Sequence, residues 1–235
     1  MYQFDSTIRY SEVDADCNLT IPALMNYFQD CTTFHSETVG NGVKALAKRK
    51  QAWMLSFYQI CIKQMPKFLD EVTIATYPYE IKGFYGFRNF CVTDKKGNRC
   101  AYANSIWVLM DITTGRPAKV TQDVIEAYGQ DEKLDMEYCD RKLLIPQEVE
   151  TKEKIVVPSF FIDSNHHMNN EKYVMLAAEY VPNDFKVGEL RVEYKKEAKW
   201  KDVIVPVVAR EEKRITVGLL DESQKPYAIV AFLEK

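Results

Sequence analysis

The same order of predicted elements runs twice along this 235-residue chain, and this internal repeat limits the fold more than any other feature of the sequence. In each half a strand-like run leads into a polar turn, a helical pattern and then several further strands. Residues Val13–Thr20 align with Ile162–Asn169, and Phe68–Val72 resembles Trp200–Val203. The chain is therefore interpreted as a diverged tandem duplication.

The first copy is predicted to begin with a strand at residues 4–13 and a polar turn at 14–18. Apolar residues then recur at helical spacing, which predicts a helix that Thr20 caps and that Gly40 ends. Branched and aromatic runs predict four strands, and a shorter helical pattern follows them. The strands are expected at 53–62, 71–79, 85–93 and 101–112, and the short helix at 120–128.

The second copy repeats this pattern with a strand at 155–162, a polar turn and a helix at 170–181. Its later strands are expected near 189–198, 202–212, 213–220 and 226–234. One helix and an antiparallel sheet of about five strands in each copy indicate the α+β class, with the sheet covering the helix. The predicted domains are 1–118 and 151–235, joined by a linker at 119–150.

Composition excludes several classes of protein. A balance of 46% hydrophobic and 28% charged residues is that of an ordinary globular chain, and a formal charge of −3 argues against nucleic-acid binding. No apolar run approaches the roughly 20 residues of a membrane span. Asp5 and Arg9 come too early for a secretory signal, and six scattered cysteines without a C-x-x-C pair favour reduced thiols. A cytoplasmic location is expected.

The chemistry is expected in the turn before the second helix, where two of the three histidines lie. Asn169 or Asn170 is a suitable N-cap, so the turn faces the positive end of a helix dipole. The two copies differ at three aligned positions, which are Asp14, Asp16 and Asn18 in the first and Asp163, Asn165 and His167 in the second. Aspartate ionises near pH ~4 and histidine near ~6.5, so only the second copy carries a base that titrates near neutrality.

The polar turn alone leaves other interpretations open. Asp-x-Asn sequences before helices often act only as caps. His166 is expected to be solvated or structural, because neighbouring residues on a turn point apart, and His35 is expected on the core face of the first helix. Adjacent histidines rarely converge on one ion and no third ligand pattern is visible, so neither a metal nor a cofactor is predicted.

At these residues the chain resembles a known family. The segment Asp163-x-Asn165-x-His167-x-Asn169-Asn170-x-x-Tyr173 is similar to the D-x-N-x-H-x-N-N-x-x-Y motif of acyl-ACP thioesterases, enzymes built from two fused hot-dog folds. The resemblance covers nearly the whole chain, and without a plastid transit extension it is to a bacterial-type member. Further matching segments are Glu193–Ala198, which resembles E-Y-R-R-E-C, and Tyr85–Arg88, Ser105–Asp111 and Thr114–Arg116.

Two departures from the family pattern bear on the chemistry. Ala198 stands where many relatives carry cysteine, so a cysteine nucleophile is excluded at that position. Lys195 and Lys196 replace the two arginines of the E-Y-R-R segment, which keeps the charge and loses bidentate geometry.

The resemblance implies two tandem hot-dog domains and hydrolysis of a fatty acyl thioester on acyl carrier protein, as a step of fatty acid biosynthesis. It implies Asp163, Asn165, His167 and Glu197 as the catalytic residues. Glu197 and His167 would polarise a water, and Asn165 with backbone N–H groups at the helix start would bind the oxyanion. Asp163 would orient a neighbour or act on the water directly, and the division of these roles stays open.

The substrate suggests two further groups of residues, each equally or better explained as ordinary core or solvated surface. Candidates for an acyl tunnel are Trp53, Leu55, Phe57, Phe87, Phe90 and Trp107. Candidates for docking the acidic carrier protein are Lys44, Lys48, Arg49, Lys50, Lys195, Lys196, Lys199 and Lys201.

Other functions compete with this one. An acyl-CoA thioesterase of the hot-dog superfamily would use the same chemistry, and a non-catalytic acyl-binding module would use none. A hydratase is disfavoured because its D-x-N-x-x-H spacing would place Met168 at the histidine position. Since a duplicated hot-dog chain already contains the pairing that single hot-dog domains obtain by dimerising, monomer and homodimer both fit.

Overall fold

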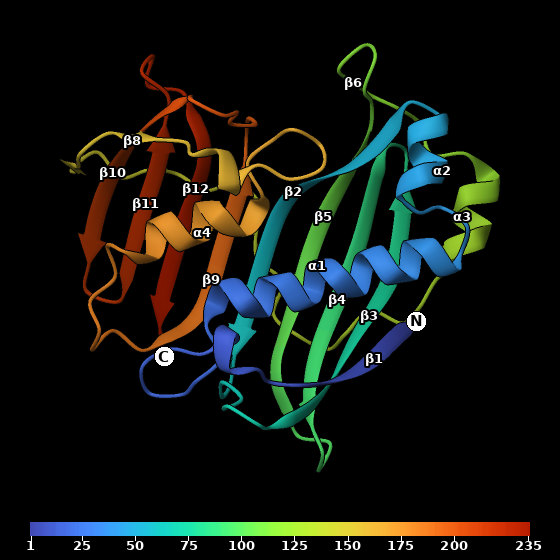
Figure 1. Ribbon diagram of the computed structural model, residues 1–235, viewed down its shortest axis with the longest axis horizontal. Coiled ribbons are helices and arrows are strands. Elements are labelled where there is room, and N and C mark those ends of the chain that lie inside the picture. Colours follow the sequence, from blue (N-terminus) through green and yellow to red (C-terminus); the bar gives the residue numbers. More distant parts are fainter. The chain divides into compact units, whose positions relative to one another are not determined.

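The computed structural model describes residues 1–235 and divides into two compact units. The first comprises Met1–Ser56 and Ile62–Tyr138, and the second comprises Phe57–Cys61 and Cys139–Lys235. Each unit is an antiparallel sheet with a helix lying across one face (Figure 1), so the predicted α+β class is confirmed. None of the helices has both the length and the apolar composition needed to cross a membrane.

The first unit has one long helix, two short ones and a mainly four-stranded sheet. Its strands are ordered β1-β3-β4-β5, with β6 paired to β5 and every pairing antiparallel. The helices are α1 (Ile21–Thr38), α2 (Val43–Lys48) and α3 (Gln122–Tyr128), with a 3-10 turn η1 at Tyr10–Glu12. The strands are β1 (Tyr2–Thr7), β3 (Glu71–Lys82), β4 (Tyr85–Asp94), β5 (Arg99–Asp111) and β6 (Arg116–Pro117). Strand β2 (Gln51–Ile62) belongs to this unit at both ends and to the second unit in its middle.

Helix α1 forms as its spacing predicts. The Thr20 hydroxyl accepts the N–H of Ala23 at 3.3 Å, and the proline at the second helical position needs no such partner. Leu24, Phe28 and Cys31 lie on the buried face. The ring of Phe28 stacks on Phe90 of β4 with 4.8 Å between ring centroids, so the helix is fixed by apolar packing on the sheet.

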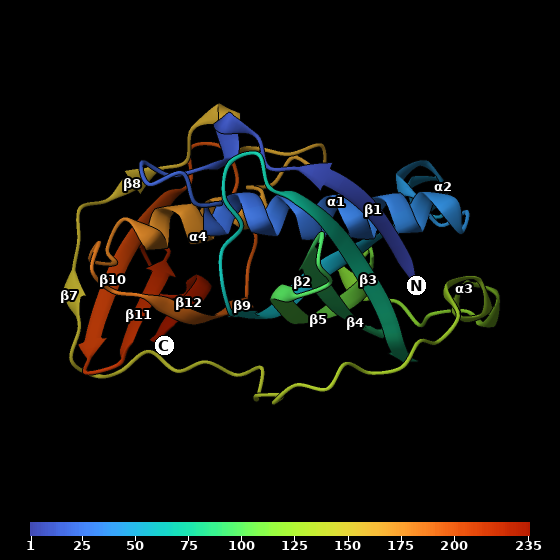
Figure 2. The same ribbon diagram turned by 90° about the horizontal axis from the view of Figure 1, so that it is seen from below.

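Residue alternation along β4 sends side chains to both faces of the first sheet. Phe90 contacts α1, whereas Asn89 points to the opposite face. There the Asn89 carboxamide oxygen accepts the N–H of Leu134 and the hydroxyl of Tyr138, each at 3.0 Å. The segment after α3 therefore covers the face that α1 leaves open, as Figure 2 shows for residues 129–138.

A polar cluster is buried under the C-terminal half of α1. Nη1 of Arg88 lies 3.0 Å from Nδ1 of His35 and 3.2 Å from the Thr76 hydroxyl. A guanidinium can only donate, so Nδ1 of His35 accepts and the imidazole is neutral. Burial first, and then the charge of Arg88, lower the pKa of His35 to about 4.

The second unit is smaller. The middle of β2 pairs with β9, and the order then continues β9-β12-β11-β10-β7, with β8 also on β10. Helix α4 lies across one face of this sheet (Figure 1). Its elements are β7 (Glu150–Thr151), β8 (Ile155–Val156), η2 (Ser159–Phe161), α4 (Asn170–Ala178), β9 (Val187–Tyr194), β10 (Val203–Glu211), β11 (Arg214–Leu220) and β12 (Pro226–Glu234).

Four predicted elements extend too far. The strand expected near 189–198 corresponds to β9, which ends at Tyr194, so Glu197 lies on the loop that follows it. The strands expected at 4–13 and 155–162 end at Thr7 and Val156, and each gives way to a 3-10 turn that directs the chain into the polar turn. The apolar composition of these runs does not distinguish a strand from such a turn. The helix expected to reach residue 181 ends at Ala178, because i→i+3 hydrogen bonds tighten its last turn before Pro182.

We predict that Phe28→Ala lowers the free energy of unfolding by about 3–5 kcal/mol, because it removes a fully buried ring. Chemical denaturation of both proteins measures the difference. Tyr10→Ala is the control, since that ring is 78% exposed and its loss should change stability by no more than about 0.5 kcal/mol. Equal effects of the two changes would contradict the packing described for α1.

We also predict a pH-dependent stability from His35. An unfolded histidine binds a proton below pH ~6.5, whereas folded His35 resists protonation until the pH approaches about 4. Its contribution is therefore complete above pH ~6.5 and is lost as the pH falls towards 4. Denaturation between pH 7 and 4 should show a flatter profile for His35→Gln than for wild type, with the exposed His166→Gln as control. A profile unchanged in His35→Gln would contradict this assignment.

Candidate active site

A tight turn presents the predicted catalytic residues ahead of α4. The Asp163 N–H donates to the carbonyl of His167 at 2.8 Å, and His166 donates to the Asp163 carbonyl at 3.0 Å. Oδ1 of Asp163 accepts the N–H groups of Asn165 at 2.8 Å and His167 at 3.4 Å. His166 takes the left-handed conformation with φ 63°. The Asp163 carboxylate thus closes the turn from which His167 projects.

The same turn occurs at three places where no chemistry is expected. In the first copy Oδ1 of Asp14 accepts the N–H groups of Asp16 at 3.0 Å and Asn18 at 2.9 Å. The hairpin loops that begin at Asp94 and Asp221 are closed in this way too, by N–H groups two and four residues further on. An aspartate at the first position of such a turn therefore closes the turn wherever it occurs in this chain, and Asp163 does the same.

The structure brings His167 and Glu197 together. Nε2 of His167 lies 2.9 Å from Oε2 of Glu197, which the loop after β9 carries. The His167 side chain is 25% exposed, that of Glu197 is 42% exposed, and Nδ1 of His167 is buried with no hydrogen-bond partner. When the imidazole is neutral with its hydrogen on Nε2, it donates to Glu197 and keeps a lone pair on Nδ1. The contact joins two groups of the kind that together form a general base and the residue that orients it.

A backbone hydrogen bond holds the two loops at this distance. The N–H of Met168 donates to the carbonyl of Ala198 at 2.8 Å. The first copy repeats it at the aligned positions, where the N–H of Leu19 donates to the carbonyl of Pro66, also at 2.8 Å. Each loop therefore meets its partner through main-chain groups. In the second copy the side chains one residue earlier, those of His167 and Glu197, lie side by side.

The start of α4 offers fewer free donors than the dipole argument suggests. The Asn169 side chain accepts the N–H of Glu171 at 3.3 Å, and the Asn169 carbonyl accepts the N–H of Lys172 at 3.0 Å. These two groups are satisfied within the helix, as in an ordinary capped terminus. Asn170 is the first residue of the helix, where the N–H has no acceptor within the helix, and Asn165 lies exposed on the turn.

Other predicted residues take no part in this cluster. His166 is exposed on the turn, and His35 is buried in the first unit. Lys195 is paired with Glu193, and Lys196 with Asp221 at 3.0 Å, so both candidate docking lysines are engaged within the second unit. No group of three or more histidine, cysteine, aspartate or glutamate side chains is arranged to hold a metal ion.

Tyr173 belongs to the motif, although the residues alone indicated no role for it. Its hydroxyl accepts the N–H of Ala198 at 2.8 Å, inside the second unit. The signal is visible only when the copies are compared, because Leu24 and Pro66 occupy the aligned positions in the first. Tyr173 is therefore added to the residues that build the site.

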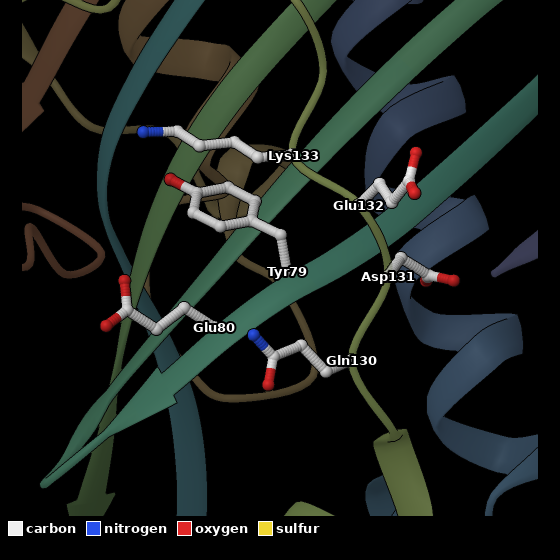
Figure 3. Close-up of a pocket in the computed structure, with 6 residues that line it drawn as sticks. All are labelled: Tyr79, Glu80, Gln130, Asp131, Glu132 and Lys133. Atoms are coloured by element: carbon white, nitrogen blue, oxygen red, sulfur yellow. The ribbon is translucent and has the colours of Figure 1, made fainter.

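A pocket of about 650 Å³ lies on the first unit and is drawn in Figure 3. Four of its six lining residues are charged, which makes it unsuited to hydrocarbon, because burying those groups would cost their hydration. It contains none of the predicted catalytic residues. The lining residues are Tyr79, Glu80, Gln130, Asp131, Glu132 and Lys133.

Solved structures of similar fold support the predicted architecture. An acyl-ACP thioesterase from Bacteroides thetaiotaomicron superposes with a TM-score of 0.90 at 21% identity, over 99% of this chain and 97% of that one. The 12:0-ACP thioesterase from Umbellularia californica superposes with a TM-score of 0.84 at 22% identity, over 100% and 96%. The prediction of two tandem hot-dog domains is confirmed.

Sequence relatives and family models agree. A chloroplastic acyl-[acyl-carrier-protein] hydrolase of Cuphea viscosissima is 26% identical over 227 residues, covering 89% of this chain and 55% of that protein. This chain thus spans about half the length of the curated relatives it matches. The acyl-ACP thioesterase N-terminal domain model matches residues 1–128, and the C-terminal domain model matches residues 145–229. With both of the family's domains in order, this chain belongs to the acyl-ACP thioesterase family.

Proposed function

We propose that this protein hydrolyses the thioester of a fatty acyl group carried by acyl carrier protein and releases the free fatty acid, a step that ends chain growth in fatty acid biosynthesis. The observation that carries the proposal is the 2.9 Å contact between His167 and Glu197. It lies in the second copy, which has histidine at the turn position where the first copy has Asn18. Family membership and relatives named as acyl carrier protein hydrolases support it.

In the proposed mechanism His167 activates a water. The Nε2–H of His167 donates to Glu197, and this pair takes a proton from the water as the water oxygen attacks the thioester carbonyl. The resulting tetrahedral intermediate expels the carrier thiolate, and the protonated His167–Glu197 pair returns the proton to the sulfur. General acid–base help of this kind is worth about 10²–10⁴ in rate.

Asn165 and Asp163 have different parts in this scheme. We assign the developing oxyanion to the Asn165 carboxamide and the Asn170 N–H at the start of α4, where the helix dipole favours negative charge. Asp163 shapes the turn, because its Oδ1 already accepts two backbone N–H groups. Its effect on the reaction is therefore exerted through the position of His167.

Exposed positive charges near the site, together with the family, favour acyl carrier protein over coenzyme A as the carrier of the acyl group. Lys199 and Lys201 follow Glu197 on an exposed loop and are proposed as docking charges for the acidic carrier protein. Steady-state hydrolysis of matched acyl-ACP and acyl-CoA panels tests this choice, and acyl-ACP is expected to be the faster substrate. Faster turnover of acyl-CoA would make the protein an acyl-CoA thioesterase, and no turnover of either would leave an acyl-binding module.

We predict that His167→Ala lowers kcat on acyl-ACP by at least ~10²-fold, the lower end of general-base catalysis. The rate at which the free carrier thiol is released at saturating substrate measures kcat. His166→Ala is the matched control, because the neighbouring imidazole is exposed and has no part in the pair, and it should leave kcat unchanged. Equal losses in the two variants would remove His167 from the mechanism.

We predict that Asp163→Asn retains most of the activity whereas Asp163→Ala does not. Asparagine keeps an oxygen that accepts the same two N–H bonds, so the turn persists, while alanine removes it. Comparison of kcat for the two variants checks this. Asp14→Ala, the same change in the first copy, should leave kcat unaffected. If asparagine were as damaging as alanine, Asp163 would act through its charge on the water and the turn-shaping role would be wrong.

A further inference from the structure

We propose that Tyr173 is a positioning residue of this active site: its hydroxyl holds the Glu197–Ala198 segment where Glu197 can orient His167. The inference rests on the proposed function. The N–H of Ala198 donates to the Tyr173 hydroxyl oxygen at 2.8 Å. Ala198 is fully buried and Tyr173 is 2% exposed, so no water competes for this bond.

The bond completes a clamp on a single residue. The Ala198 carbonyl accepts the N–H of Met168 at 2.8 Å, and its own N–H donates to Tyr173. Glu197 immediately precedes Ala198, and His167 immediately precedes Met168. Fixing both polar groups of Ala198 therefore fixes the 2.9 Å separation of the two side chains that carry the chemistry.

The first copy shows that the fold does not require this hydroxyl. Its aligned residues are Leu24, fully buried on α1, and Pro66. The carbonyl half of the clamp is kept, since Leu19 donates to Pro66 at 2.8 Å. The second hydrogen bond of the clamp lacks both its donor and its acceptor, because Pro66 has no N–H and the Leu24 side chain has no acceptor. Donor and acceptor occur together only in the copy that also has the histidine and the glutamate.

The surroundings of Tyr173 keep its hydroxyl neutral and in place. Burial is the main cause that raises the pKa of Tyr173, and the negative charge of nearby Glu197 raises it further. The ring packs edge-on against Tyr194 with 5.7 Å between centroids. That packing does not involve the hydroxyl, so a phenylalanine would keep the ring position and lose only the bond to Ala198.

The test is Tyr173→Phe, assayed on acyl-ACP together with amide hydrogen exchange. We expect kcat to fall by about tenfold to a hundredfold, the effect of a misplaced catalytic group, with KM unchanged. Exchange at the Ala198 amide should become fast. Tyr128→Phe is the matched control, since it removes a buried hydroxyl that bonds Ser36 at 2.9 Å in the first unit, and it should leave kcat unchanged.

Two double variants separate positioning from a general structural effect. In a Glu197→Gln background, Tyr173→Phe should cost much less than in wild type, because both changes act on the same interaction. In Tyr173→Phe/Ala198→Pro, position 198 has no N–H, as at Pro66 in the first copy, so no unpaired buried donor remains. Part of the kcat lost in Tyr173→Phe should therefore return. The second variant also serves if Tyr173→Phe alone is too unstable to assay.

The outcomes distinguish this inference from the proposed function. If wild type is active and Tyr173→Phe leaves kcat unchanged, the inference alone is overturned. The same holds if Tyr173→Phe costs as much in the Glu197→Gln background as in wild type, or if Ala198→Pro restores no kcat to Tyr173→Phe. A wild type that hydrolyses neither acyl-ACP nor acyl-CoA removes the proposed function, and the inference with it.

Discussion

The hydrogen bond from the Met168 N–H to the Ala198 carbonyl is the contact on which the active site depends. It joins the turn before α4 to the loop after β9, and so places His167 beside Glu197. Main-chain groups make this bond, and every residue except proline has the donor. The contact therefore survives in the first copy, between Leu19 and Pro66, although nearly all the side chains around it differ.

Duplication followed by divergence explains why one site suffices. Both copies keep the aspartate-closed turn and the helix cap, which belong to the fold. Only the second has a histidine on the turn and a glutamate on the loop after β9, and the hydroxyl of Tyr173 accompanies them. In the first unit the fully buried Leu24 stands at the position of Tyr173, and burial first and then the charge of Arg88 lower the pKa of His35. The same backbone thus serves packing in one copy and chemistry in the other.

Local patterns made much of this predictable. Helix α1, the strands and the loops at Asp94 and Asp221 follow from spacing and turn chemistry, which are properties of neighbouring residues. The pairing of His167 with Glu197 joins residues thirty positions apart, and only the family resemblance indicated it. The clamp on Ala198 was missed, because it depends on which face of α4 carries Tyr173 and on a buried N–H that no periodicity reveals.

The most direct test of the account is a double-mutant cycle on kcat/KM for acyl-ACP with His167→Ala, Glu197→Ala and both changes together. If Glu197 acts by orienting His167, the double variant should be little worse than His167→Ala alone, with a coupling energy of at least about 1 kcal/mol. Losses that simply add would show that the two residues act independently, and would contradict the oriented general base that the 2.9 Å contact indicates.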